Sequence, residues 1–154
     1  MKQILFFLFP MGFLIMGCSS IKKADSSNVT QGITGLVTMV TGNQMPGPGV
    51  TKPAPKGIPA TILVYEPTNL SQVTQSGTSP LYTAINTPMV ASVVADSTGV
   101  FTVALPAGSY SLFVKQGKLF FANLFDTNNH ISLFTVEEGK LTKVKLTVNS
   151  GASY

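Results

Sequence analysis

The stretch ADSTGVFTVALPAGSYSLFVK, Ala95 to Lys115, decides the fold. It contains an aspartate, hydroxyl residues and glycines, which occur both in catalytic loops and in tight turns. Its apolar residues recur at every second position, as in strands that bury one face. We therefore predict a β-hairpin whose inner faces are Phe101, Val103 and Leu105 on the first strand and Tyr110, Leu112 and Val114 on the second.

The polar residues of this stretch are those that tight turns require. The Asp96 carboxylate can accept from a backbone N–H two residues on, and Gly99 can adopt a positive φ. Pro106 cannot donate to a ladder, so it ends the first strand, and Gly108 completes the reversal. We interpret these residues as structural.

The rest of the chain predicts an all-β domain. Of 154 residues, 44% are hydrophobic and 10% charged, with 14 Gly and 10 Pro that favour strands and turns over helices. About seven short candidate strands are separated by turn signals, which is typical of a sandwich or barrel. They span residues 33–40, 60–66, 88–96, 100–106, 109–115, 130–136 and 140–148.

The central stretch resembles the signature of carboxypeptidase regulatory-like domains, a transthyretin-like (prealbumin-like) β-sandwich family. ITGLV and KGIPATILVYE upstream, and VEEGKLTKVKLTV downstream, are similar to further strands of that family. The resemblance implies one seven-stranded Greek-key β-sandwich over residues 32–150, with longer insertions at 42–59 and 67–88, and an accessory rather than catalytic role. The matching hairpin positions are Asp96, Gly99, Phe101, Val103, Leu105, Pro106, Gly108, Tyr110, Leu112 and Val114.

The amino terminus has the pattern of a targeting segment. Lys2 precedes an apolar run from Ile4 to Met16, which is shorter than the ~20 residues that span a bilayer. The sequence Ile15-Met16-Gly17-Cys18 resembles the lipobox of bacterial lipoproteins. That resemblance implies that residues 1–17 are a cleaved signal peptide and that Cys18 is lipidated.

Residues 18–31 follow as the lipidated cysteine and a polar, Ser-rich tether. Lipid chains contribute about 0.8 kcal/mol per buried CH₂ group, so two or three of them hold a protein at a membrane. Because Ser19 and Ser20 stand where an aspartate would indicate retention at the inner membrane, the resemblance implies the outer membrane of a Gram-negative cell envelope.

The residues offer no catalytic set, so we do not expect an enzyme or a cofactor. His130 is the single histidine, and Asp126 lies only four positions before it. Asp126, Asn128, His130 and Glu137 follow a spacing like that of a calcium loop, but Ile131 stands where such a loop needs glycine. We interpret this segment as a solvated turn, with no metal.

Two segments are candidate interaction surfaces. The Pro- and Gly-rich insertion at 42–59 includes Asn43, Gln44, Met45 and Pro46 near its start, and long loops on a rigid sandwich often carry recognition. KLFFANLF, 118–125, is apolar on both faces of any strand. Core burial is the favoured interpretation of its residues, and an exposed contact patch that includes Phe120 and Phe125 is the alternative.

The expected function is therefore that of a membrane-anchored protein-interaction or structural module whose partner is another envelope protein. A carbohydrate-binding module is the alternative, with Tyr65, Tyr82 and Tyr110 as possible sugar platforms, although the chain has no Trp. All ten basic residues are lysines and they are scattered along the chain, which argues against nucleic acid as a partner.

Overall fold

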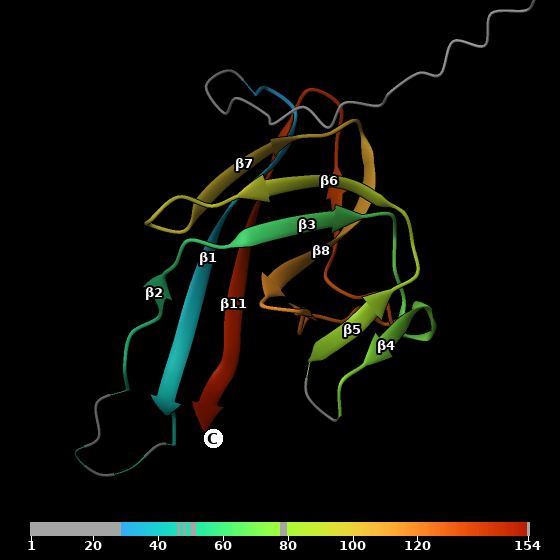
Figure 1. Ribbon diagram of the computed structural model, residues 1–154. Helices are drawn as coiled ribbons and strands as arrows, with labels where there is room; N and C mark the ends of the chain where they lie inside the picture. The colour runs from blue at the N-terminus through green and yellow to red at the C-terminus, as the bar shows by residue number, and fades with distance from the viewer. Residues whose placement is uncertain (1–28, 46, 48, 50–51, 78–79, 154) are drawn as a thin grey trace, which may run out of the picture.

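The computed structural model describes residues 29–45, 47, 49, 52–77 and 80–153. The predicted signal peptide (residues 1–17), Cys18 and Pro46 lie outside these residues. The described chain folds into two packed β-sheets (Figure 1), which confirms the predicted β-sandwich. Within it, no helix is long and apolar enough to cross a membrane.

Strand β1 (Gly32–Asn43) is the centre of the first sheet. It pairs in parallel with β11 (Leu141–Ser153) on one side. On the other side it pairs antiparallel first with β7 (Val100–Ala104) and then with β2 (Lys56–Gly57). The two longest strands, β1 and β11, therefore come from opposite ends of the domain and lie side by side (Figure 1).

The second sheet is larger, and β8 lies at its centre. Its order is β4-β5-β9-β8-β3-β6, and β10 pairs with one end of β8. A 3₁₀ turn, η2 (Leu70–Gln72), precedes β4. The strands are β3 (Thr61–Tyr65), β4 (Val73–Gln75), β5 (Leu81–Ile85), β6 (Met89–Val94), β8 (Gly108–Gln116), β9 (Leu119–Phe121) and β10 (Leu133–Val136).

The predicted number of strands was too low, because the described residues form eleven. Strands β4 and β5 lie in the insertion expected at 67–88; β4 has only three residues, and the burial of β5 does not alternate along its five. β9 lies in KLFFANLF. Conversely, the strand predicted over 130–136 begins only at Leu133, because Ser132 has a left-handed backbone with φ 43°.

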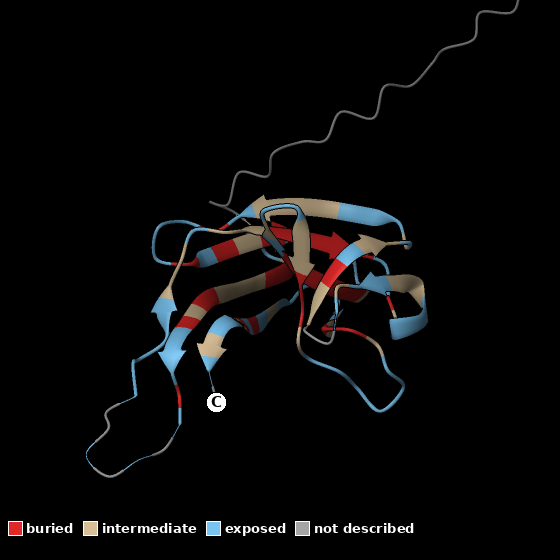
Figure 2. Ribbon diagram, turned by 60° about the horizontal axis from the view of Figure 1, so that its bottom comes forward, coloured by how far each residue is buried: buried red, intermediate tan, exposed pale blue. Residues whose placement is uncertain are grey.

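The main core fills the space between the two sheets. On β8, Tyr110, Leu112 and Val114 face this core, and on β7 Phe101 and Val103 face it from the opposite sheet. Figure 2 shows the buried residues as red segments along strands of both layers. The alternation read from the sequence therefore identified the core-facing residues of these strands correctly.

A second core covers the other face of β3 and β8. Phe113 is fully buried there, and the rings of Tyr65 and Tyr82 approach it edge-on with centroid distances of 5.5 Å and 5.8 Å. Strand β3 alternates between the cores: Ile62 faces the first and Leu63 the second. The central strands of the second sheet are thus apolar on both faces.

The predicted hairpin is wrong, because its two strands belong to different sheets. Strand β7 pairs with β1, whereas β8 pairs with β3, β9 and β10. The link at Pro106 crosses the sandwich, and the Tyr110 hydroxyl donates to the Pro106 carbonyl at 3.1 Å. The two apolar faces meet across the core instead of lying side by side, and both arrangements require the same alternation.

The predicted Asp96 turn is confirmed, and it also links the two sheets, from β6 to β7. One Asp96 carboxylate oxygen accepts from the Thr98 N–H at 2.8 Å, the Thr98 hydroxyl at 2.6 Å and the Val100 N–H at 3.0 Å. Gly99 has the expected positive φ, 88°. Its carbonyl also accepts from the Val37 N–H at 2.8 Å, so the turn rests directly on β1.

We predict that Gly99→Ala lowers the free energy of unfolding by more than about 2 kcal/mol. A Cβ at Gly99 would lie 2.2 Å from the Val37 carbonyl oxygen, so backbone would have to move. Gly139 is the matched control, because it has φ 67° and no atom within 4 Å of a built Cβ. Gly139→Ala should cost only the left-handed strain of about 1 kcal/mol. Equal losses in urea unfolding would contradict the close-approach argument.

Candidate functional site

A hairpin between β9 and β10 carries the most exposed aromatic side chain of the described residues. The Ser132 N–H donates to the Leu124 carbonyl at 2.8 Å, and Phe125 and Ile131 form an isolated bridge. Ile131 is fully buried in the second core, whereas Leu124 is 45% and Phe125 51% exposed. The hairpin is thus anchored through one arm and presents apolar side chains on the other.

The tip of this hairpin is fixed by Asp126. One carboxylate oxygen accepts from the backbone N–H groups of Asn128 and His130, both at 2.8 Å, and the other lies 2.8 Å from the His130 Nδ1. These bonds, first the one from the His130 N–H, lower the pKa of Asp126. Asn129 supplies the left-handed residue of this turn, with φ 61°.

Glu137, the last position of the calcium-like spacing, does not join this tip. It forms an ion pair with Lys140 beyond β10, which lowers the pKa of Glu137 and raises that of Lys140. Among the described residues, no three His, Cys, Asp or Glu side chains gather. Asp126 and His130 instead bond to each other, and Asp126 accepts hydrogen bonds from the backbone of the turn.

The 3₁₀ turn η2 lies against the hairpin. Asn69 and His130 form a bridge, and the Leu70 N–H donates to the Asn129 carbonyl at 3.1 Å. Asn69 also caps η2 reciprocally, since its side chain accepts from the Ser71 N–H at 3.0 Å while Gln72 accepts from the Asn69 N–H. The junction leaves Leu70 42% exposed.

We call this region the hairpin surface. It combines exposed apolar side chains with a shallow hollow of about 440 Å³ whose rim is rich in amides. The residues are Leu70, Leu124 and Phe125 as the apolar part, and Asn69, Leu70, Ser71, Asn128 and Asn129 as the lining of the hollow.

Buried hydrogen bonds connect the hairpin surface to the second sheet. The Thr68 N–H donates to the Ser111 hydroxyl at 3.0 Å, and the Thr68 carbonyl accepts from the Ile131 N–H at 2.8 Å. Ser132 accepts at its carbonyl from the Leu112 N–H at 3.1 Å. Since Thr68, Ser111 and Ile131 are fully buried, the surface is preorganised on the sheet.

The candidate residues of KLFFANLF divide between core and surface. Phe121 and Ala122 are buried, and Phe120 packs partly buried against the second core. Phe125 is exposed, next to Leu124. The favoured core interpretation therefore describes Phe120 and its neighbours, while the alternative describes Phe125. The sequence did not single out Leu70, an apolar residue between Asn69 and Ser71, and it included Leu124 only as part of the segment 118–125.

The other candidate group lies at the end of β1, on the other sheet. Asn43 is exposed and accepts from the Met45 N–H at 2.8 Å. Gln44 is buried. Its backbone N–H donates to the Ser153 carbonyl at 2.7 Å, and its side-chain amide donates to the Thr41 carbonyl. Met45 is 53% exposed, and Pro46 lies outside the described residues. The fold does not bring this group to Phe120 or Phe125.

The three candidate sugar platforms are buried. Tyr82 is fully buried and donates to the Ala122 carbonyl at 3.3 Å, and Tyr65 packs against Phe113 in the same core. Burial raises the pKa of both phenols. Tyr110 faces the first core, and its hydroxyl donates to the Pro106 carbonyl. No ring face of these tyrosines is available for stacking on a sugar.

No protein family, curated protein or solved structure matches this chain.

We predict that Phe125→Ser changes the free energy of unfolding by less than about 0.5 kcal/mol, because half of this side chain is already in water. Phe121 is a buried core residue of the same segment, so Phe121→Ser should lower the free energy of unfolding by at least about 3 kcal/mol. Urea unfolding of both variants tests this. A loss at Phe125 as large as that at Phe121 would show that Phe125 belongs to the core.

We predict that the loss of folded-state stability at acidic pH depends in part on Asp96. Its hydrogen bonds, first the one from the Thr98 hydroxyl, lower its pKa in the folded state. The stabilisation is therefore present above the unfolded value of about 3.9 and lost as pH falls through the lower folded pKa. Asp96→Asn keeps an acceptor oxygen but does not titrate, so its Tm should fall less than the parent's between about pH 5 and pH 2.

The Asp96→Ala variant is the control, since it removes the acceptor at every pH. Its Tm should be lower than the parent's at neutral pH, whereas Asp96→Asn should stay close to the parent. An Asp96→Asn variant that is as destabilised as Asp96→Ala at neutral pH would contradict a simple capping role.

Proposed function

We propose that this chain is a lipid-anchored envelope lipoprotein whose β-sandwich binds another envelope protein through the hairpin surface. The observation that carries the proposal is the exposed pair Leu124 and Phe125 on a hairpin that is fixed by Asp126 and anchored by Ile131. Rigid apolar side chains at the surface cost little entropy on binding, and aromatic ones are common energetic centres of interfaces.

The polar neighbours of this patch support a protein as the partner. The hollow beside Leu70 is lined by Asn69, Ser71, Asn128 and Asn129, residues that offer donors and acceptors without a net charge. An apolar centre with a polar rim is the usual anatomy of a protein interface. We propose a structural role for Asp126 and His130, because the Asp126 carboxylate also accepts from the backbone N–H groups of Asn128 and His130 and so holds the turn.

We also propose membership in the carboxypeptidase regulatory-like family. The matched pattern supports it, since Phe101, Val103, Leu105, Tyr110, Leu112 and Val114 all lie in the first core. In that family the domain is an accessory unit, which agrees with a binding role. The glycan-binding alternative finds no support in the buried positions of Tyr65, Tyr82 and Tyr110.

The anchor is tested with Cys18→Ser. We expect the chain with its native Cys18 to incorporate labelled palmitate and to sediment with membranes. The Cys18→Ser variant should not incorporate the label. Palmitate incorporation that persists in Cys18→Ser would contradict the lipobox interpretation. This test involves only the amino terminus, so its outcome is separate from that of the interaction surface.

The interaction surface is tested by photo-crosslinking in intact cells. We expect a crosslinker placed at Phe125 or Leu124 to capture one dominant envelope protein, and Phe125→Ser to reduce capture from position 124 at least tenfold. Val100, 48% exposed on β7, is the control position for an apolar side chain outside the surface. Capture from Phe125 that does not exceed capture from Val100 would contradict the proposal.

A further inference from the structure

Strand β6 is an open and apolar edge of the second sheet. It pairs with β3 on one side, and no described strand pairs with its other side. Met89, Val90 and Val94 are 48%, 43% and 63% exposed. In Figure 2 this strand carries no buried segment. Folded proteins usually protect such edges with charges, prolines or short strands, and Met89–Val94 contains neither a charge nor a proline.

The register with β3 shows which backbone groups face outward. The Ala95 N–H donates to the Ala60 carbonyl at 2.8 Å, and the same register continues through Val93 with Ile62. In an antiparallel ladder, successive residues direct their N–H and C=O groups to opposite sides. Those of Ser92 and Val94 therefore point to the open edge, where they can bond another strand.

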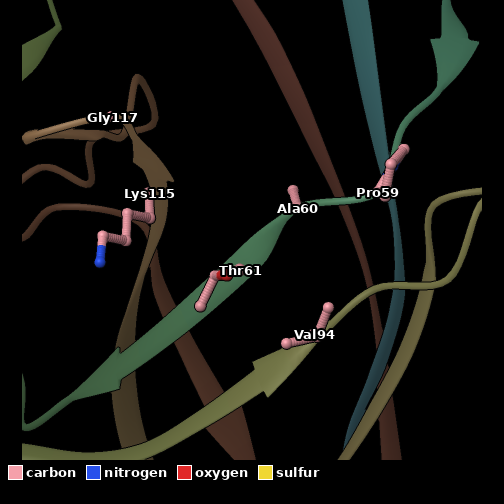
Figure 3. Close-up of a pocket in the computed structure, with 6 residues that line it drawn as sticks. All are labelled: Pro59, Ala60, Thr61, Val94, Lys115 and Gly117. Atoms are coloured by element: carbon pink, nitrogen blue, oxygen red, sulfur yellow. The ribbon is translucent and has the colours of Figure 1, made fainter.

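The side chains follow the same alternation. Ala91 and Val93 pack against the first core, while Val94 stands on the outer face of the sheet. Beside Val94 that face is a shallow hollow of about 480 Å³, and in Figure 3 the side chains of Thr61 and Lys115 stand around it. The backbone edge and an adjoining apolar flank are thus exposed together.

We infer that β6 pairs antiparallel with β6 of a second copy of this chain, with the twofold axis at Ser92. Ser92 and Val94 are the outward positions of the regular ladder, and the exposed Val90 lies at the bulge before it, so the segment Val90-Ala91-Ser92-Val93-Val94 places valines symmetrically about Ser92. In this register, Val94 of each copy lies opposite Val90 of the other, and the two Ser92 residues face each other. Apolar and hydroxyl cross-strand pairs of this kind stabilise antiparallel sheets.

A second copy fits this edge better than an unrelated strand because its symmetry is built into the sequence. A bulge at Val64–Tyr65 makes Val90 the extra residue of β6, so the regular ladder with β3 runs from Ala91 to Val94. That run includes the proposed axis. By contrast β11, which ends the first sheet, presents Lys143 and Lys145 as exposed side chains, and like charges would oppose self-pairing there.

The test is disulfide trapping in the purified full chain in detergent micelles. Ser92 pairs with itself across the axis, where Cα atoms of a hydrogen-bonded pair lie about 5.5 Å apart, a span that disulfides bridge. Two copies of Val94 would be about 14 Å apart, at ~3.4 Å per residue. We expect Ser92→Cys to give mainly dimer and Val94→Cys to give none above the parent, whose only cysteine is Cys18.

Further variants make the register specific. The double variant V90C/V94C should restore the crosslink, and Thr74→Cys on β4, the other edge of the same sheet, should not form one. Val94→Lys should reduce the dimer fraction in sedimentation at least tenfold with an unchanged Tm, while Val100→Lys should not. Because a strand pair alone is smaller than a standard interface of about 1,600 Å², the dimer fraction should depend on concentration.

A Ser92→Cys chain that stays monomeric would overturn the inference, including the case in which β6 pairs with a strand of a different protein. Equal crosslinking of Ser92→Cys, Val94→Cys and Thr74→Cys would also overturn it, since that indicates unspecific contact. The inference is independent of the proposed function: the β6 edge can fail this test while the hairpin surface still captures a partner, and the reverse also holds.

Discussion

The close approach of three chain segments to β1 is the constraint on which the first sheet depends. Strands β11, β7 and β2 each pair with β1 and with no other described strand of that sheet. A Cβ at Gly35 would lie 2.5 Å from the Val144 carbonyl oxygen, and one at Gly99 would collide with the Val37 carbonyl. Backbone therefore packs directly against backbone around β1, and only glycine, which has no Cβ, fits at these two positions.

The second sheet follows a different principle, because its central strands are buried on both faces. Strand β8 places Leu112 in the core between the sheets and Phe113 in the second core. The second core also holds Ile131, which anchors the hairpin surface. The same packing that stabilises β8 therefore positions Phe125, which pairs with Ile131.

The candidate site was only partly predictable. Phe125 was named from the sequence, because an apolar run longer than a core needs leaves residues in excess. Leu70 was not, since its exposure depends on the contact between η2 and Asn129. The aromatic residues Tyr65 and Tyr82 could serve either as platforms or as core, and composition cannot separate the two. Their burial depends on Phe113, which lies in another strand.

The sequence by itself determined what is local: the Asp96–Gly99 turn, the turn after Asp126 and the core-facing sides of β7 and β8. These features rest on hydrogen bonds within four residues and on alternation along one strand. Only the tertiary structure decided which strands pair. Thr38 on β1 bonds Thr147 on β11 across 109 positions, and β7 and β8 face each other across the core although they are consecutive. An alternating strand buries the same residues whichever strand it pairs with. The alternation therefore does not identify the pairing partner.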